Sequence, residues 1–263
     1  MLARPDEGVD VARAALLIAG EEYPGLDVPR YLARLDEMGG AVRRRMDGAK
    51  GAVAALNAYL FEEEGFHGNE VDYYDPRNSF LNEVLDRRTG IPITLSTVYI
   101  EVAQRAGLAA AGVGLPGHFI VKVSAGRGDV LVDPYHQGRR LSAEDCQERL
   151  DRIYSGRLKV NAAMLAPCAR KSILARMLRN LKAIYLKTGE QERALRILDL
   201  LLQVNPRSGE DVRDRGLLYA ALDCYNLAAR DLQAYVELFP RAPEAAELRE
   251  QVAEYRGKAA RVN

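Results

Sequence analysis

Two residues at the ends of neighbouring predicted strands, His118 and Asp133, are the first candidates for chemistry in this sequence. His118 follows the glycine-rich run GVGLPG (112–117), where the backbone can approach closely and the imidazole can face a cleft. Asp133 lies fifteen residues later, at the end of the next strand. Adjacent antiparallel strands bring such ends together, so Asp133 could fix the tautomer of a histidine that acts as a base. A purely structural histidine–aspartate hydrogen bond is equally consistent with this spacing.

His136 raises one further hypothesis, a metal site. His136 lies three residues after Asp133 and could join His118 and Asp133 as a third ligand. All three ligands would come from one hairpin, which is weak support for a metal, and we expect neither a metal nor a cofactor. His67 lies in a loop that contains glycine, and we expect it to be exposed.

The cysteine pattern and the charge balance exclude several classes of protein. Cys146, Cys168 and Cys224 are odd in number and form no CxxC pair, which indicates free thiols in a reducing compartment rather than a disulfide or zinc framework. The 37 basic and 37 acidic residues form no basic stripe, so we expect neither nucleic acid nor a membrane surface as a partner. The sequence has no signal-peptide pattern and no apolar run of about 18 residues, so we expect a cytoplasmic protein.

The periodicity of apolar residues predicts the helices that would position these side chains. Helical spacing runs through residues 11–64 and again through 92–107, where Pro92 begins the helix and Gly107 ends it. Residues 66–80 break the pattern with glycine, asparagine and an Asp-Pro pair, which predicts an irregular surface loop.

Two short β-rich runs follow the second helical segment. Residues 118–123 and 130–133 are predicted strands, and the segment SAGRGD (124–129) between them has the glycines of a hairpin turn. Helices followed by a hairpin predict an α+β domain in which helices pack on a small antiparallel sheet.

An internal repeat occupies the C-terminal third of the chain. Four kinds of residue recur 34 positions apart: Tyr185 and Tyr219, Ala194 and Ala228, Leu198 and Leu232, and Pro206 and Pro240. This period, with a small residue where two helices cross and a proline after the second helix, is typical of tetratricopeptide repeats. Because stability usually needs about three repeats, we expect the first repeat to pack against the N-terminal domain or against a helix that ends near Cys168. We also expect residues 244–258 to form a charged cap.

Four motifs in a fixed order resemble a known family. They are DPRNSFLNEVLDRRTG (75–90), GIPITLSTVYIEVAQRAGL (90–108), GVGLPGHFIVKV (112–123) and LVDPYHQGRRLS (131–142). With the repeats, they resemble the bacterial SirB-type proteins, in which tetratricopeptide repeats follow a transglutaminase-like core. The resemblance covers nearly the whole chain, and it implies a papain-like core with a central helix packed on an antiparallel sheet.

Periodicity and resemblance together divide the chain into four parts. Residues 1–65 are the N-terminal helical preface of the core, and 66–150 are the transglutaminase-like core. Residues 151–171 form a connector, and 172–258 form the tetratricopeptide-like repeats with a capping helix. The all-α repeats therefore follow an α+β core.

The resemblance also implies roles for particular residues. Active members of the wider transglutaminase-like superfamily use a Cys–His–Asp triad whose cysteine opens the central helix. His118 and Asp133 match the family histidine and aspartate, whereas Pro92 stands at the cysteine position and carries no nucleophile. Ser96, about one turn along the helix, or Thr94 could substitute, although both are also ordinary helix residues.

Two hypotheses for function follow. The first is a non-catalytic, regulatory module in which His118 and Asp133 shape a groove and the repeats bind a protein or peptide. The second is an amide hydrolase or acyltransferase that uses Ser96 or Thr94 with His118 and Asp133. Cys168 is a poor substitute nucleophile, because it lies beyond the core motifs and would have to fold back onto His118.

Charge is balanced over the whole chain but not locally. Basic residues predominate in 174–207, and acidic residues predominate in 240–254. A basic first repeat and an acidic C-terminal helix indicate either an acidic peptide partner or self-association of the two surfaces.

Overall fold

The computed structural model describes residues 5–46, 51–125 and 128–262. The chain forms two compact units, with the boundary between Met177 and Leu178. This boundary lies inside one helix, α7 (Arg170–Thr188). None of the described helices combines the length and apolar character that crossing a bilayer requires.

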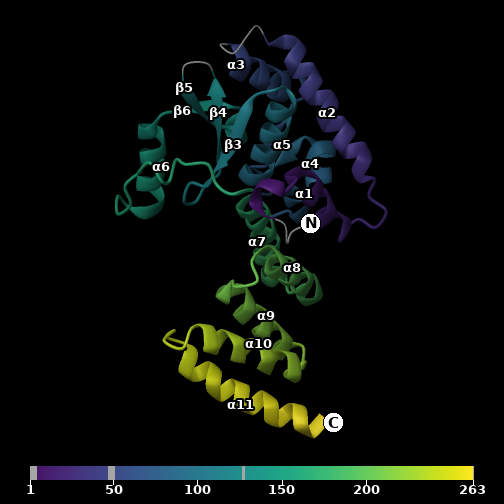
Figure 1. The fold of residues 1–263 in the computed structure, drawn as a ribbon, viewed down its shortest axis with the longest axis vertical. Coiled ribbons are helices and arrows are strands. Elements are labelled where there is room, and N and C mark those ends of the chain that lie inside the picture. Colours follow the sequence, from purple (N-terminus) through teal and green to yellow (C-terminus); the bar gives the residue numbers. More distant parts are fainter. Residues whose placement is uncertain (1–4, 47–50, 126–127, 263) are drawn as a thin grey trace. The chain divides into compact units, whose positions relative to one another are not determined.

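Helices make up the N-terminal part of the first unit (Figure 1). They are η1 (Asp6–Gly8), α1 (Val11–Gly20), α2 (Val28–Arg45), α3 (Ala52–Asn57) and the π-helix η3 (Ala58–Glu63). Asp27 caps α2, because its carboxylate accepts from the N–H of Arg30 at 3.1 Å, and a proline fits the first turn of the helix.

The central helix α5 (Pro92–Arg105) lies between these helices and the main sheet. Twelve of its fourteen residues are buried, and it packs against α2 on one side and against the sheet on the other (Figure 1). Four strands form that antiparallel sheet in chain order: β3 (Ala109–Val113), β4 (Ile120–Ala125), β5 (Gly128–Asp133) and β6 (Arg139–Leu141). The predicted α+β architecture, a central helix on a small antiparallel sheet, is confirmed.

Two details of the sheet differ from the sequence-based expectation. β4 begins at Ile120, so His118 lies in the loop before the strand rather than inside it. β3 and β6 were not expected, because a strand of three alanines, glycine and valine has low β propensity and β6 has only three residues. Part of the predicted turn, residues 126–127, lies outside the described residues.

The segment 66–80 is more ordered than a surface loop. β1 (His67–Gly68) pairs in parallel with β2 (Thr89–Gly90), and η4 (Pro76–Ser79) leads into α4 (Leu81–Arg87). The fully buried side chain of Asn78 accounts for much of this order, because the loop folds around it.

After β6, helix α6 (Ala143–Tyr154) packs against the sheet. Ser142 caps the helix and exchanges hydrogen bonds with Asp145 in a capping box. Cys146 and Leu150 contribute to a buried cluster with Val113, Leu115 and Ile120. This packing brings residues of α6 to the end of β5.

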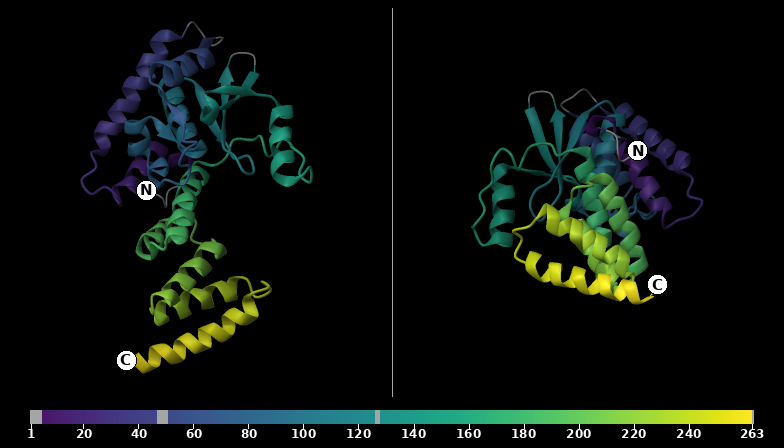
Figure 2. Two further views of the ribbon diagram at one scale, coloured as in Figure 1. Left: turned by 180° about the vertical axis from the view of Figure 1, so that it is seen from behind. Right: turned by 60° about the horizontal axis from the view of Figure 1, so that its bottom comes forward.

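The second unit consists of helices (Figure 2). They are the end of α7, then α8 (Gln191–Val204), α9 (Gly209–Ala221), α10 (Tyr225–Leu238) and α11 (Ala245–Val262). α10 repeats α8 at a displacement of 34 residues, and a proline follows each of them, as the sequence predicts. Ala194 and Ala228 are fully buried, which agrees with small residues at close helix crossings.

A buried lysine cross-links two helices of this unit. The ammonium of Lys182 donates to Asp211 at 2.8 Å, Asp214 at 2.9 Å and Glu210 at 3.2 Å. Burial alone would lower the pKa of Lys182, but these carboxylates outweigh it and raise the pKa above its ordinary value. The basic character expected on the first repeat is therefore partly internal, because Lys182 is not exposed.

We expect the substitution Lys182→Met to destabilise the protein by about 3 kcal/mol, because Asp211 would stay buried without its cation. Denaturant unfolding followed by circular dichroism measures the change. The control is Arg196→Met, an exposed residue of α8 with no ion pair to any described residue, which should change stability by less than about 0.5 kcal/mol. Equally small effects in both variants would contradict this role of Lys182.

Candidate functional site

The structure brings His118 and Asp133 into direct contact. Nε2 of His118 lies 2.8 Å from Oδ2 of Asp133, and the two side chains are 3% and 1% exposed. Gly117, with φ of +73°, turns the chain before His118, whose N–H donates to the carbonyl of Leu115 at 2.9 Å. The turn and the end of β5 therefore hold the imidazole against the carboxylate.

Two further side chains and one backbone group meet the same carboxylate. Nδ1 of His136 lies 2.8 Å from Oδ2 of Asp133, and Nη2 of Arg149 donates to the same oxygen at 3.3 Å. The other oxygen, Oδ1, accepts from the N–H of Tyr135 at 3.2 Å. Asp133 is thus the acceptor at the centre of a four-donor cluster, and its negative charge is compensated by Arg149.

These contacts set the protonation of the cluster. Burial lowers the pKa of His118 and outweighs the opposing effect of Asp133, so the imidazole is neutral near pH 7. Burial would raise the pKa of Asp133, but its interactions with His118 and His136 hold that pKa below its ordinary value. A neutral His118 that donates from Nε2 to a carboxylate carries its lone pair on Nδ1.

The same three side chains have the spacing of a metal site. Ligand atoms of His118, Asp133 and His136 all lie within 4.8 Å of one another. However, both imidazoles already bond to one oxygen of Asp133, and the guanidinium of Arg149 adds a fixed positive charge beside it. The donor set therefore fits a hydrogen-bonded cluster better than a cation site.

The hydroxyl groups at the start of α5 are committed to backbone partners. Oγ1 of Thr94 donates to the carbonyl of Asn78 at 2.8 Å and accepts from the N–H of Ile91 at 3.1 Å. Oγ of Ser96 donates to the carbonyl of Phe119 at 3.4 Å. Both residues are fully buried, and within the described part of the chain neither hydroxyl is hydrogen-bonded to His118.

The cysteines are also separate from the histidine. All three are free, and Cys168 donates its backbone N–H to Gly112 at 2.8 Å. Burial raises the pKa of Cys168, which keeps it a thiol, and no described contact joins it to His118. His67 is exposed as expected, but it has partners, because Nε2 lies 3.1 Å from Oγ1 of Thr89.

A pocket of about 610 Å³ borders the cluster on the side of His136. Its walls come from residues 67–71 and 135–137. His136 is 42% exposed, so it connects Asp133 with the surface, while His118 lies behind it with the two rings 6.0 Å apart. Solvent and ligands can therefore reach the cluster through His136.

Comparisons with known proteins give the family. Residues 29–179 match the model of the transglutaminase-like superfamily, and residues 181–253 match a tetratricopeptide repeat model. A UPF0162 protein of Xylella fastidiosa is 39% identical over 89% of this chain and 86% of its own length. The chain belongs to the SirB-type (UPF0162) family of transglutaminase-like proteins.

Other relatives agree with this family. A UPF0162 protein of Pseudomonas aeruginosa is 33% identical over 84% of this chain and 81% of its own length. The protein SirB1 of Salmonella typhimurium is 28% identical over 75% of this chain and 73% of its own length. In this SirB-type chain, a transglutaminase-like domain is therefore followed by tetratricopeptide repeats.

Sequence reasoning missed two residues of the site in this SirB-type protein. Arg149 lies sixteen residues after Asp133 on a helix that was not predicted, so no spacing rule pointed to it. Asn78 lies inside one of the family motifs, but its role depends on long-range contacts. Its amide donates to the carbonyls of Asp72 and Tyr73, and its Oδ1 accepts from Asn69 and Arg87.

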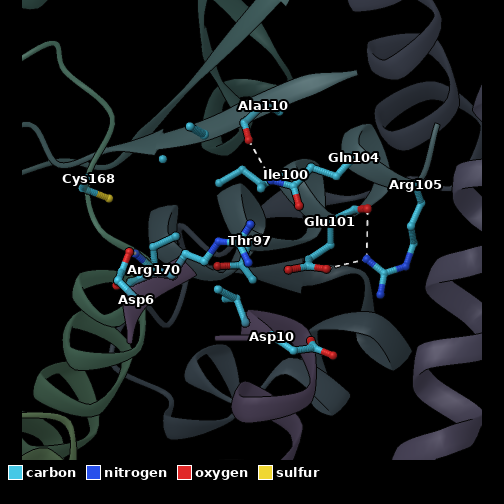
Figure 3. A pocket seen from close by; sticks show the side chains of 14 residues that line it. Asp6, Asp10, Thr97, Ile100, Glu101, Gln104, Arg105, Ala110, Cys168 and Arg170 are labelled. Atoms are coloured by element: carbon cyan, nitrogen blue, oxygen red, sulfur yellow. Dashed lines mark hydrogen bonds and ion pairs between the residues drawn. The ribbon is translucent and has the colours of Figure 1, made fainter. Parts of the chain in front are cut away.

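A second pocket of this SirB-type protein, of about 410 Å³, lies on another face of α5 (Figure 3). Glu101 lines it, paired with Arg105, and burial raises the pKa of Glu101. Asp6 accepts from the N–H groups of Arg170 and Lys171, both at 2.9 Å, and so caps the start of α7. Glu101 and Asp6 therefore already have partners within the protein. The pocket lies where residues 6–10 pack near the start of α7.

We expect long-range ¹H–¹⁵N NMR spectra to show His118 as the Nε2–H tautomer with a titration midpoint below 6.5. Asp133→Asn should lower the midpoint further, because the charge of Asp133 favours the imidazolium. The unfolded chain takes up this proton near pH 6.5 and the folded chain does so only at lower pH, so stability should fall as the pH drops below about 6.5. A midpoint above 6.5 would contradict the burial argument.

We expect Asn78→Ala to destabilise the protein by about 2–3 kcal/mol, because several buried polar groups would lose their partner. Denaturant unfolding measures the loss. Asn226→Ala is the matched control, since Asn226 is exposed on α10 and makes no hydrogen bond with any described side chain. If both variants were equally stable, Asn78 would not organise the 66–80 segment.

Proposed function

We propose that this protein is a non-catalytic, cytoplasmic transglutaminase-like module that binds a protein or peptide, with the repeats as its main binding surface. In this proposal, the His118–Asp133 pair shapes and rigidifies the site and no longer activates a nucleophile. The observation that carries the proposal is the combination of an intact, buried pair with a helix start that offers it no nucleophile.

The chemistry at the start of α5 supports the absence of turnover. Pro92 stands at the position that a catalytic cysteine would occupy and has neither a thiol nor a hydroxyl. The hydroxyls of Thr94 and Ser96 satisfy backbone groups, so deprotonating either would leave a buried carbonyl without its donor. A base without a nucleophile within hydrogen-bond reach is not a catalytic pair.

The repeats support the binding part of the proposal. Tetratricopeptide arrays usually present a surface that binds extended protein segments. Two leucines on the first helices of the two repeats, Leu186 and Leu217, are 44% and 40% exposed. Exposed apolar side chains on a repeat array are candidate contacts for a partner.

A hydroxyl-reactive fluorophosphonate probe tests the absence of catalysis. We expect no labelling of the folded protein at Ser96 or Thr94, both in the wild type and in His118→Ala. Stoichiometric labelling of Ser96 that disappears in His118→Ala would overturn the proposal in favour of an amide hydrolase or acyltransferase.

Affinity capture with the full chain tests the binding part. A partner captured by the wild type should be retained by Ser96→Ala and lost by the double variant Leu186→Asp and Leu217→Asp, which should keep its fold because both side chains are exposed. Circular dichroism checks the fold. A partner that is lost in Ser96→Ala but retained in the leucine variant would contradict binding through the repeats.

A further inference from the structure

Arg176, on α7 in the first unit, is a partly buried cation without an anion. It is the one arginine in residues 5–46, 51–125 and 128–262 that is not exposed and makes no ion pair within that set. Other partly buried arginines, such as Arg105 and Arg215, each bond to two carboxylates. Burying a charge without a partner costs free energy, so Arg176 needs an explanation.

The guanidinium lies beside the residue that follows His118. Its central carbon is 5.6 Å from the ring centroid of Phe119, and this ring is buried. Such stacking supports the flat face of a guanidinium but leaves its N–H donors, which lie at the edge, without acceptors. Among the described residues, Arg176 donates no hydrogen bond to any group.

Arg176 interacts electrostatically with Tyr73, whose ring begins a row of rings that leads to the His118 cluster. Burial raises the pKa of Tyr73, and the positive charge of Arg176 opposes this rise. The Tyr73 ring packs edge-on against Tyr135 at 6.3 Å, and Tyr135 packs against His136 at 5.1 Å. A row of three rings therefore runs from Tyr73, on which the charge of Arg176 acts, to the pocket beside His136.

The pKa of Arg176 agrees with the absence of an ion pair. Arg176 is the single arginine of the described residues whose pKa is lowered, and burial is the main cause. Its charge also acts on the hydroxyl of Tyr154 at the end of α6 and on the Cys168 thiol, which are neutral groups. No carboxylate compensates it from β4, α6 or the 66–80 segment in the described structure.

We propose that Arg176 is the anchor of a carboxylate-binding subsite, which takes a carboxylate of a bound peptide beside Phe119 and Tyr73. A planar guanidinium binds a carboxylate through two parallel N–H···O bonds, and a carboxylate supplies the missing counter-charge. The carboxylate is either the end of the peptide chain or an acidic side chain. The tyrosine row then lies along the rest of the peptide.

This inference rests on the proposed function, since it names the ligand class of a binding module. It narrows the basic segment 174–207 that the sequence indicates to one residue. Lys182, one of the cations in that segment, is occupied by three carboxylates, whereas Arg176 is available.

The test uses the full chain with ¹⁵N-labelled arginine and three pools of N-acetylated pentapeptides. The first pool has mixed sequence and a free carboxylate end, the second has the same sequences with a carboxamide end, and the third has a carboxamide end with glutamate at the central position. NMR follows the Nε–Hε signal of Arg176, and the titration gives the dissociation constant.

We expect the first or the third pool to shift the Arg176 signal and the second pool to leave it unchanged. A response to the first pool alone identifies the chain end as the ligand, and a response to the third identifies an acidic side chain. Arg176→Met should weaken binding by about tenfold or more, and Arg176→Lys should weaken it less, because it keeps the charge but loses the planar fork. No shift from any pool, or equal shifts from the first and second pools, would overturn the proposal.

Stability separates a binding role from a structural one. Arg176→Met should unfold at the same temperature as the wild type or higher, because it removes an unpaired charge from a partly buried position. Arg43→Met is the control for binding, since Arg43 is exposed on α2 and pairs with no described carboxylate. A lower unfolding temperature with unchanged peptide affinity would make Arg176 a structural residue and overturn the subsite.

The two proposals can fail separately. Labelling of Ser96 by the fluorophosphonate would overturn the absence of catalysis, whatever Arg176 does. Retention of a repeat-bound partner, with no labelling and no response of Arg176 to carboxylates, would overturn the subsite alone.

Discussion

The buried carboxylate of Asp133 is the constraint on which the first unit depends. A carboxylate with 1% exposure is stable only when hydrogen bonds and a cation replace its water. Its donors come from three places in the chain: the turn before β4, the short helix η5 (Pro134–His136) and α6. The loop that carries His118 and the helix that carries Arg149 must therefore reach the end of β5 together. The polar cluster consequently fixes the arrangement of the sheet, and the apolar cluster beneath α6 supports it.

The same arrangement gives the His118–Asp133 pair a structural role. Burial keeps His118 neutral, and Asp133 holds its orientation, so the pair contributes to structure whether or not a nucleophile is present. Around the start of α5, Thr94 and Ser96 bond to carbonyls of Asn78 and Phe119, which ties the helix to the loops on either side of it. The polar groups at the start of α5 therefore join elements of the first unit to one another.

The two units differ in how their buried charged groups are paired. In the repeats, Lys182 and its carboxylates form an internal network, and Glu244 bonds to Arg213 and Tyr235, which lower its pKa to about 2. These groups balance one another and present little net charge. Arg176 in the first unit differs, because it is partly buried and pairs with no described carboxylate. The zero net charge of the sequence therefore conceals a partly buried, unpaired cation. This cation lies over the ring of Phe119, the residue that follows His118.

The sequence by itself determined the elements whose signals are local. Proline and glycine mark the ends of α5, and the 34-residue period fixes α8 and α10, because caps and periodicity act within a few turns of one helix. It also determined that His118 and Asp133 meet, since a hairpin leaves few alternatives. Only the tertiary structure decided that an alanine-rich segment becomes β3 and that Arg149 reaches Asp133. It also decided which carbonyl groups accept hydrogen bonds from the hydroxyls of Thr94 and Ser96. These outcomes depend on contacts between residues distant in the chain, which no local pattern encodes.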